Sequence, residues 1–312
     1  MRHGAETDEK DVFFTPVACV FRGLLRGILL NARIDLHAHT TASDGVLTPS
    51  ELVEFAIERR VHLLGITDHD STEGIVGALN RADGTPVEVW PGVELSTDVS
   101  NSEVHMLGYF VNLRNKEFQE ILARLRDSRV WRAQQMVIKL TELGMPLNFE
   151  RVQEIAGTGS IGRPHVAQAL LEKGYVRTTK DAFDLYLGRN GPAYVERFKL
   201  TPVEAVQLIV KAGGMPVLAH PTYINPGEDS GFELSTFVHE LIGEGLVGLE
   251  CYYGDYPPEI IRGLCKIARE FDLIPTGGSD FHGRGMHTAD LGDPEIPQET
   301  IDRMRAWRAA NS

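Results

Sequence analysis

The chain has 312 residues, of which 42% are hydrophobic and 24% charged, and its formal net charge is −13 at pH 7. This length allows one α/β barrel with an insertion or two domains, whereas a net acidic chain lacks the extended basic surface of a duplex DNA binder. Cys19, Cys251 and Cys265 form an odd count without metal-type spacing. This argues against a disulfide framework and favours a reducing cytoplasm.

The first 31 residues have no pattern that predicts a function. Their longest apolar stretch, Val12 to Leu30, is interrupted by Arg22 and Arg26 and follows the charged segment 9–11. This stretch is typical of neither a signal peptide nor a membrane span. A short amphipathic helix and a frayed leader remain the two alternatives, and we expect no membrane association.

From residue 33 on, short apolar runs of β type alternate with helical signals. The runs are Arg33 to Leu36, His62 to Ile66, Val87 to Val93, Val104 to Phe110, Met215 to Ala219, Val247 to Tyr252 and Leu273 to Pro275. Seven strands joined by helices predict a parallel α/β barrel, one strand short of the common eight-stranded form.

Two helix starts between these strands have the same chemistry. Thr48-Pro49-Ser50-Glu51 reads as an N-cap, a first-turn proline and a capping-box glutamate, and Thr201-Pro202-Val203-Glu204 repeats the pattern. Each is followed by apolar residues on one face, which predicts two amphipathic helices.

A basic segment interrupts the alternation. Residues 113–199 hold 15 Lys and Arg against 10 Asp and Glu, a net of +5, and the remaining residues carry a net of −18. We expect a basic helical insertion or lid here, with the barrel formed by residues 32–112 and 200–300 and a C-terminal tail at 301–312. Such a lid would attract phosphate esters. An equal alternative is that the Lys and Arg residues are ordinary solvated side chains on helices.

Within the insertion, helical periodicity over 117–143 ends at Gly144, and a second helix over 164–173 ends at Gly174. The segment Gly159-Ser160-Ile161-Gly162-Arg163-Pro164-His165 lies between them. An arginine at a helix start can direct its guanidinium and free backbone N–H groups at one phosphate.

Nine residues of metal-ligand type fall at or near the strand ends. They are His37, His39, Asp44, His69, Glu94, His105, His220, Asp280 and His282. Because barrel enzymes build their sites at the carboxyl ends of parallel strands, we expect these side chains to converge at one mouth. Imidazole and carboxylate ligands without thiolate suit Mn²⁺ best here, with Zn²⁺ or Fe²⁺ as alternatives, and nine ligands exceed the need of one ion.

Each motif alone has an ordinary explanation. His37 and His39 alternate along a strand and can chelate one ion, yet such pairs are often incidental. Thr67-Asp68-His69-Asp70 can be a capped polar loop, and Ser279-Asp280-Phe281-His282 a turn. His105 and His220 can be core histidines. Their joint placement favours a multinuclear metallohydrolase.

The motifs together resemble the PHP (polymerase and histidinol phosphatase) superfamily. The matching segments are Asp35-Leu36-His37-Ala38-His39-Thr40, Ser43-Asp44-Gly45, Ile66-Thr67-Asp68-His69-Asp70, Pro91-Gly92-Val93-Glu94-Leu95-Ser96, Val104-His105, Ala219-His220-Pro221 and Gly278-Ser279-Asp280-Phe281-His282. The resemblance covers about residues 33–290 and implies a distorted seven-stranded (β/α) barrel with two to three metal ions.

The resemblance also implies how the ligands divide. His37, His39, Glu94 and Asp280 would hold one ion, Glu94 would bridge to a second ion with His105 and His220, and Asp44, His69 and His282 would hold a third. Glu94 and Asp280 would act catalytically through the ions and their shared hydroxide, which attacks phosphorus without a covalent enzyme intermediate. Asp68 and Asp70 are candidate proton donors for the leaving group, with metal-bound water or a nearby His as alternatives, but we expect them instead to orient or cap the loop around His69.

The insertion, with its Gly-Arg-Pro-His segment, is similar to that of bacterial 3′,5′-nucleoside bisphosphate phosphatases, a branch that includes 5′-to-3′ exoribonucleases acting on short RNA. The similarity implies that Arg163 grips the phosphate that is not cleaved. Arg129, Arg132, Arg197 and Lys199 are weaker candidates, with solvated surface charge as their alternative. His165 is expected to pack the helix.

The leading hypothesis is therefore removal of the 3′-phosphate from nucleoside 3′,5′-bisphosphates, extending to short 5′-phosphorylated RNA ends. Hydrolysis of cyclic nucleotides, sugar phosphates or histidinol phosphate on the same metal site is the close alternative. An amidohydrolase-type C–N hydrolase and a noncatalytic PHP scaffold are alternatives of another class.

Overall fold

The computed structural model describes residues 33–99, 102–157, 159–225, 227, 230–285 and 289–311. The N-terminal residues 1–31, for which no function is predicted, lie outside the described residues. Within the described ranges, no helix is both long enough and apolar enough to span a membrane.

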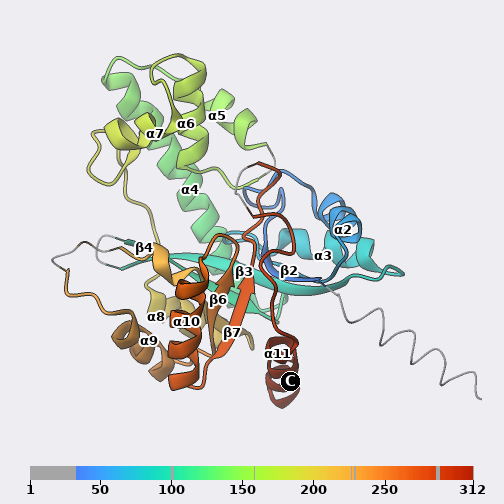
Figure 1. The fold of residues 1–312 in the computed structure, drawn as a ribbon. Helices are drawn as coiled ribbons and strands as arrows, with labels where there is room; N and C mark the ends of the chain where they lie inside the picture. Colours follow the sequence, from blue (N-terminus) through green and yellow to red (C-terminus); the bar gives the residue numbers. More distant parts are fainter. Residues whose placement is uncertain are drawn as a thin grey trace, which may run out of the picture. The chain divides into compact units, whose positions relative to one another are not determined.

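Seven strands form one sheet in chain order, as predicted. They are β1 (Arg33–Ala38), β2 (Val61–Ile66), β3 (Glu88–Val99), β4 (Ser102–Tyr109), β5 (Met215–Leu218), β6 (Gly248–Tyr253) and β7 (Ile274–Gly278). Ala38 at the end of β1 forms a parallel bridge with Phe281, just beyond β7. The two outer strands thus meet, and the sheet is a nearly closed α/β barrel (Figure 1).

The expectation of an all-parallel barrel is wrong for β4, which runs antiparallel to both β3 and β5. β3 ends at Val99 and β4 begins at Ser102. A connection this short can join only antiparallel neighbours, because a parallel crossover needs a dozen or more residues. The reversal brings the first half of β4, with His105, to the end of the barrel where the parallel strands finish.

β3 is also longer than predicted. It continues to Val99, so Glu94 lies inside the strand and does not follow it. Glu94 forms a bridge with His69 on one side and is paired with Leu107 of β4 on the other. The extra length of β3 places the Glu94 carboxylate over the middle of the barrel mouth.

Helices cover the outside of the barrel. They are α2 (Pro49–Glu58), α3 (Glu73–Ala82), α8 (Pro202–Lys211), α9 (Leu234–Gly243), α10 (Pro258–Glu270) and α11 (Gln298–Ala310). The two predicted capping boxes are confirmed: the Thr48 and Thr201 hydroxyls accept from the backbone N–H of Glu51 and Glu204.

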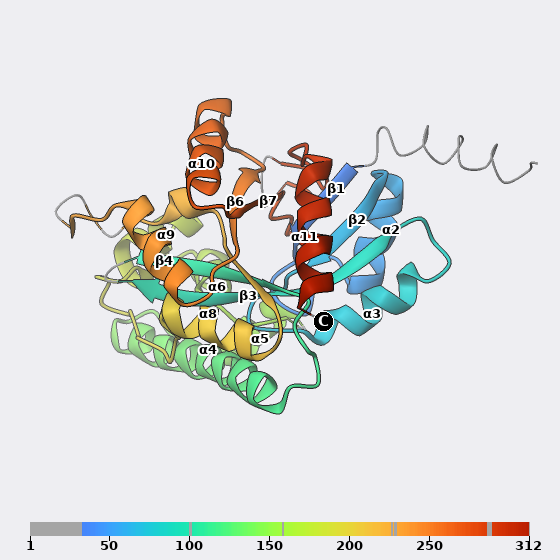
Figure 2. The same cartoon turned by 90° about the horizontal axis from the view of Figure 1, so that it is seen from below.

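The C-terminal segment is a helix that belongs to the barrel core. Figure 2 shows α11, in dark red, over the region where β7 and β1 meet. Its Ile301 and Met304 are buried with Ile34 of β1 and Ile274 of β7. Residues 301–310 of the predicted tail are thus the last ten of the thirteen residues of α11.

The insertion has its own apolar core. It contains α4 (Lys116–Glu142), α5 (Phe149–Ala156), α6 (Arg163–Glu172), α7 (Thr179–Ala182) and a π-helical turn, η2 (Phe183–Leu187). The second half of α4 packs with α5 to α7, whereas Phe118, Leu122 and Leu125 in its first half are buried in the barrel core. In Figure 1 the helices α5, α6 and α7 gather around one end of α4, away from the strands. One continuous helix therefore holds the two cores together.

Candidate metal and phosphate site

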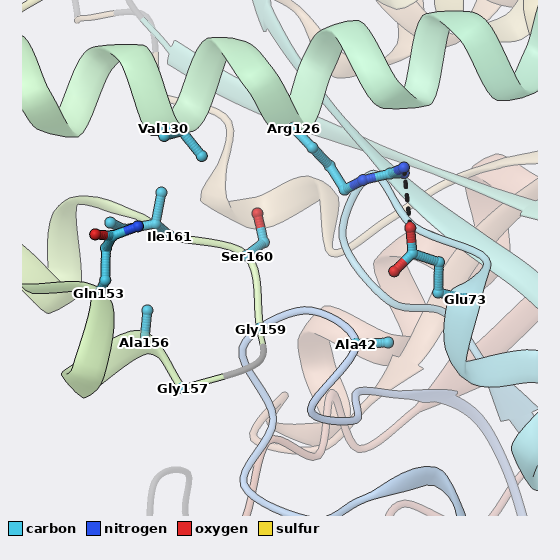
Figure 3. Close-up of a pocket in the computed structure, with 10 residues that line it drawn as sticks. All are labelled: Ala42, Glu73, Arg126, Val130, Gln153, Ala156, Gly157, Gly159, Ser160 and Ile161. Atoms are coloured by element: carbon cyan, nitrogen blue, oxygen red, sulfur yellow. Dashed lines mark ion pairs between the residues drawn. The ribbon is translucent and has the colours of Figure 1, made fainter. Parts of the chain in front are cut away.

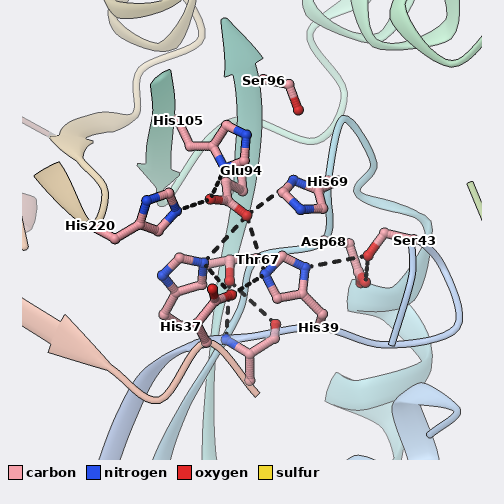
Figure 4. A network of polar contacts seen from close by, with 12 residues as sticks. His37, His39, Ser43, Thr67, Asp68, His69, Glu94, Ser96, His105 and His220 are labelled. Carbon is pink, nitrogen blue, oxygen red and sulfur yellow. Dashed lines mark hydrogen bonds and ion pairs between the residues drawn. The ribbon is translucent and has the colours of Figure 1, made fainter. Parts of the chain in front are cut away.

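The nine predicted ligands meet at one end of the barrel. Figure 4 shows Glu94 in the middle, with His37 and His39 below it and His69, His105 and His220 around it. His37 lies within β1 and His39 just beyond it, and His220 and Asp280 each lie two residues beyond β5 and β7. Residues separated by up to 245 positions therefore share one site, as the sequence predicts.

Four side chains form the most buried group. The Nε2 atoms of His37 and His39 lie 3.3 and 3.2 Å from Glu94 Oε2, and 3.3 and 3.0 Å from Asp280 Oδ1. Ligand atoms about 2.0–2.2 Å from one tetrahedral ion lie roughly 3.3–3.6 Å apart. The four atoms thus fit around a single first-row cation.

The second oxygen of Glu94 faces two further histidines. Oε1 lies 2.8 Å from His105 Nδ1 and 3.0 Å from His220 Nε2. His69 Nδ1 lies 3.0 Å from Oε2. Since the two oxygens face different histidines, Glu94 is placed to bridge two cations.

A third group lies at the edge of the mouth. Asp44 Oδ1 is 3.3 Å from His282 Nε2 and 3.7 Å from His39 Nδ1, and Asp44 Oδ2 is 3.7 Å from His69 Nε2. Ligand atoms of these four residues all lie within 4.8 Å of one another. His39 therefore stands between this group and the most buried one.

Unsatisfied buried atoms support a cation site. Six atoms of the cluster are buried without a hydrogen-bond partner: His37 Nε2, His39 Nε2, Asp44 Oδ1, His69 Nδ1, Glu94 Oε2 and Asp280 Oδ1. Buried polar groups are normally satisfied, so a concentration of exceptions in one place indicates a missing partner. Imidazole nitrogen and carboxylate oxygen both donate electron pairs to divalent cations, so these six atoms fit metal ions bound at the groups described above.

Burial and the nearby carboxylates shift the pKa values of two of these histidines in opposite directions. Burial alone would lower the pKa of His39, but the neighbouring carboxylates of Asp280 and Glu94 raise it to about 10. Burial lowers the pKa of His69 to about 4 against the attraction of Glu94 and Asp44. Protons and cations thus compete for one set of buried carboxylates.

Glu250 on β6, which sequence reasoning missed, holds two of the histidines. Its Oε1 lies 2.9 Å from His37 Nδ1, and its Oε2 accepts a hydrogen bond of 2.7 Å from the His220 backbone N–H. Glu250 is fully buried. The sequence did contain an indication of this role: Glu250 stands inside the otherwise mostly apolar strand Gly248–Tyr253, and a buried carboxylate needs a partner.

Other polar residues fix the remaining ligands. The Tyr253 hydroxyl donates to Asp280 Oδ2 at 2.8 Å. Asp68 accepts from the Thr40 backbone N–H at 2.7 Å and from the Ser43 hydroxyl at 2.7 Å, and Ser43 Oγ is 3.4 Å from His39 Nδ1. Asp68 therefore holds the segment between His39 and Asp44, whereas the sequence predicts that it orients the loop around His69.

Three residues at the mouth have left-handed backbone angles although they are not glycine. Asp70, His220 and Asp280 have φ values of 51°, 22° and 53°. Such conformations cost free energy and persist only where the surroundings enforce them, often at functional sites. The site is held in place by contacts that outweigh this cost.

A cavity of about 810 Å³ extends from the cluster into the insertion. Asp44, His69, His105 and His282 line it on the barrel side, and Arg129, Arg132 and Arg163 line it on the insertion side. Arg197 and Lys199 are not among its lining residues. Arg197 donates to the Phe198 carbonyl, and Lys199 pairs with Asp98 at 2.6 Å.

The weaker phosphate-binding candidates are not solvated charges. Arg129, Arg132 and Arg197 are at most 9% exposed, and the Lys199 side chain is 8% exposed. Arg129 is bound by Asp70 Oδ2 at 2.8 Å and donates to Ser96. The alternative that these four are surface charges is therefore wrong.

Arg132 and Arg163 face the cavity in different environments. Burial, together with Arg129 and Arg197, lowers the pKa of Arg132 to about 9. Within the described part of the chain, no carboxylate lies within ion-pair distance of Arg132. Arg163 begins α6, as predicted, and pairs with Glu103 at 3.1 Å. An anion in the cavity would stabilise both guanidinium groups.

The insertion is connected directly to the loop that carries Asp44. The Ser160 backbone N–H donates to the Ser43 carbonyl at 2.6 Å. A Cβ on Gly159 would lie 1.9 Å from the same oxygen, so only glycine fits. His165 Nδ1 accepts from the Gly162 backbone N–H at 2.9 Å, so it caps α6, and His165 also lines the large cavity. Its expected role in packing the helix stays a prediction.

A smaller cavity of about 250 Å³ lies beside this junction. Ala42, Ser160 and Val130 are among its lining residues, and Arg126 pairs with Glu73 across it at 3.1 Å (Figure 3). Because this arginine is already paired, the smaller cavity has less positive character than the large one.

Comparisons with known proteins agree with this geometry. The model of the PHP domain family matches residues 35–184. The chain is 36% identical over 251 residues to the 5′-3′ exoribonuclease Rnm of Escherichia coli, covering 80% of this chain and 84% of the relative. It is 32% identical over 269 residues to a 3′,5′-nucleoside bisphosphate phosphatase of Chromobacterium violaceum, covering 85% and 92%.

A solved structure agrees over most of the chain. A protein of Bifidobacterium adolescentis, named as a metal-dependent phosphoesterase, superposes with a TM-score of 0.78 at 30% identity and covers 88% of this chain and 96% of that one. Family, fold and clustered His, Asp and Glu side chains lead to the same conclusion. The chain belongs to the PHP domain family and is a metal-dependent phosphoesterase.

Proposed function

We propose that the protein removes the 3′-phosphate from nucleoside 3′,5′-bisphosphates and cleaves the corresponding bond at short 5′-phosphorylated RNA ends. The observation that carries this proposal is one cavity of about 810 Å³ that is lined both by four of the ligand residues, Asp44, His69, His105 and His282, and by three arginines. A substrate with one phosphate would use only one end of it, whereas a bisphosphate can use both.

The nine clustered residues would hold two to three divalent ions, for which Mn²⁺ is our first choice and Zn²⁺ or Fe²⁺ the alternatives. Bound ions would activate water and neutralise phosphate oxygens. Glu94 would bridge two ions, and Asp280, held by Tyr253, would complete the most buried group. Glu250 would keep His37 and His220 in position.

The arginines would bind the phosphate that is not cleaved. Arg132 and Arg163 line the cavity and offer planar forks that match phosphate oxygens. Arg129 is already bound by Asp70 and Ser96, so its role is to shape the wall and add positive charge. Arg197 and Lys199 lie outside the cavity lining, and we assign them structural roles.

The names of two relatives support the proposal. One is a 3′,5′-nucleoside bisphosphate phosphatase and the other a 5′-3′ exoribonuclease. The first name describes a nucleoside with two phosphates and the second an activity on RNA, and the two-ended cavity can accommodate a nucleoside with a phosphate at each end.

The test compares kcat/KM with Mn²⁺ for adenosine 3′,5′-bisphosphate, adenosine 3′-monophosphate and a chromogenic aryl phosphate. We expect the bisphosphate to be the best substrate. Arg132→Ala and Arg163→Ala should each raise KM at least about 10-fold for the bisphosphate and much less for the monophosphate. Arg151→Ala is the matched control, because Arg151 is exposed on α5 and pairs with Glu172 outside the cavity.

Two results would contradict the proposal. The bisphosphate could be no better than the aryl phosphate, or histidinol phosphate or a cyclic nucleotide could be a better substrate. An equal effect of the arginine variants on both adenosine phosphates would remove their assigned role.

A further inference from the structure

Three tyrosines pack beside His220, outside the lining of the large cavity. They are Tyr223, Tyr253 and Tyr256. We propose that Tyr223 is the stacking surface for the second base of a 5′-phosphorylated oligoribonucleotide, the base just beyond the phosphate that is cleaved. This inference rests on the proposed function.

The three rings form a fixed group against the metal-ligand cluster. The Tyr223 ring centroid lies 5.4 Å from that of His220 and 5.6 Å from that of Tyr253, which it meets edge to face. The His220 Nε2 atom is 3.0 Å from Glu94 Oε1. Tyr223 is therefore separated from the centre of the cluster by one histidine ring.

Hydrogen bonds hold the two rings that support Tyr223. The Tyr253 hydroxyl donates to Asp280 at 2.8 Å, and the Tyr256 hydroxyl accepts from the Thr222 hydroxyl at 2.8 Å. Tyr253 is 2% exposed, but Tyr223 is 56% exposed. A large exposed aromatic ring on a rigid base is the arrangement that proteins use to stack a nucleobase.

The position of Tyr223 also fits the path of an RNA strand. His220 and His69 lie on opposite sides of Glu94 in Figure 4, and His69, but not His220, lines the large cavity. With the first nucleotide in the cavity and the scissile phosphate at the cluster, the second nucleoside must continue outside the cavity. Tyr223 stands next to His220, on the side of Glu94 that faces away from His69.

The same bond is broken in both substrates. Water adds its hydroxyl to phosphorus and its proton goes to the 3′-oxygen of the first nucleotide, so that the bond between this oxygen and phosphorus breaks. In a bisphosphate, the released product is inorganic phosphate. In a dinucleotide, it is the second nucleoside carrying a 5′-phosphate, so only the dinucleotide can contact Tyr223 through a base.

The experiment measures kcat/KM with Mn²⁺ for adenosine 3′,5′-bisphosphate, for the 5′-phosphorylated adenosine dinucleotide, and for that dinucleotide with an abasic second ribose. We expect the wild-type protein to prefer the full dinucleotide over the abasic one by about 5- to 100-fold. Tyr223→Ala should bring this ratio close to one, and Tyr223→Phe should keep most of it. Trp131→Ala, which removes a 50%-exposed ring on α4, should keep the ratio.

The outcomes separate the two proposals. An unchanged ratio in Tyr223→Ala, or no preference of the wild-type protein for the second base, overturns the role of Tyr223. A wild-type protein that hydrolyses the bisphosphate but not the dinucleotide leaves the bisphosphate activity standing and overturns this inference. If neither substrate is hydrolysed, the proposed function fails and this inference fails with it.

Discussion

Glu250 and His37 contact each other at 2.9 Å, between carboxylate Oε1 and imidazole Nδ1, and both side chains are fully buried. The contact leaves His37 Nε2 directed at Glu94 and Asp280. A carboxylate behind a metal-binding histidine fixes its tautomer and ring orientation and raises its basicity. Glu250 thus connects the barrel core to the metal-ligand cluster.

Glu250→Gln should weaken metal binding about 10- to 100-fold, because the amide removes the negative charge that supports His37. Competition with a chelator, followed by metal analysis, measures the change. Glu259→Gln on the exposed face of α10 is the control and should bind metal like the wild-type protein. Unchanged affinity in Glu250→Gln would show that the contact does not tune the cluster.

Metal removal should abolish activity and lower stability. The cluster holds six buried atoms without a partner, and a bound cation satisfies them only in the folded state. Mn²⁺ at 100 times its dissociation constant would stabilise the protein by about 2.7 kcal/mol per site. Thermal unfolding in a chelator and at increasing Mn²⁺ concentration tests this, and a Tm that does not depend on Mn²⁺ would argue against tight binding.

Arg129→Ala should lower the free energy of unfolding by about 3–5 kcal/mol at pH 7, because it leaves the fully buried Asp70 without its main partner. Urea unfolding measures the change. Arg151→Ala, which breaks an exposed ion pair, should change stability much less. A small effect of Arg129→Ala would mean that Arg197 or water replaces the lost partner.

The Arg129 effect should also depend on pH. Burial would raise the pKa of Asp70, but Arg129 and Arg197 hold it below its ordinary value. Since this pKa is lower in the folded than in the unfolded state, the stabilisation is complete above the unfolded value of about 3.9 and is lost as the pH falls through the folded value. Without Arg129 the burial of Asp70 raises its folded pKa, so the difference between the wild-type protein and Arg129→Ala should shrink as the pH falls through this raised pKa towards the lower wild-type value.

Gly159→Ala should separate the insertion from the Asp44 loop. The new methyl group would lie 1.9 Å from the Ser43 carbonyl oxygen, and neither backbone can yield without breaking the hydrogen bond from Ser160. Since small displacements of positioning groups can cost about 100-fold, we expect a loss of at least 10-fold in kcat/KM for the bisphosphate. Gly263→Ala, where the added Cβ meets no atom within 4 Å, is the control.

Local sequence patterns were enough to predict much of the fold. Strand positions followed from apolar runs, and α2 and α8 followed from their capping boxes, because these signals depend on near neighbours in the chain. The reversal of β4 could also have been deduced, since only ten residues separate the predicted runs that end at Val93 and begin at Val104, and a parallel crossover needs a dozen or more. The length of β3 could not have been deduced, because its pairing with β4 extends the strand through polar residues such as Ser96 and Asp98.

By itself, the sequence determined which residues could bind metal, since imidazole and carboxylate groups stand at successive strand ends and resemble one family. Only the tertiary structure supplied the contacts and exposures on which we base the roles proposed for Glu250, Arg132 and Tyr223. A buried carboxylate, a buried arginine on a cavity wall and an exposed ring beside His220 differ by their surroundings and not by their type. Those surroundings come from residues far away in the chain, and the fold alone brings them together.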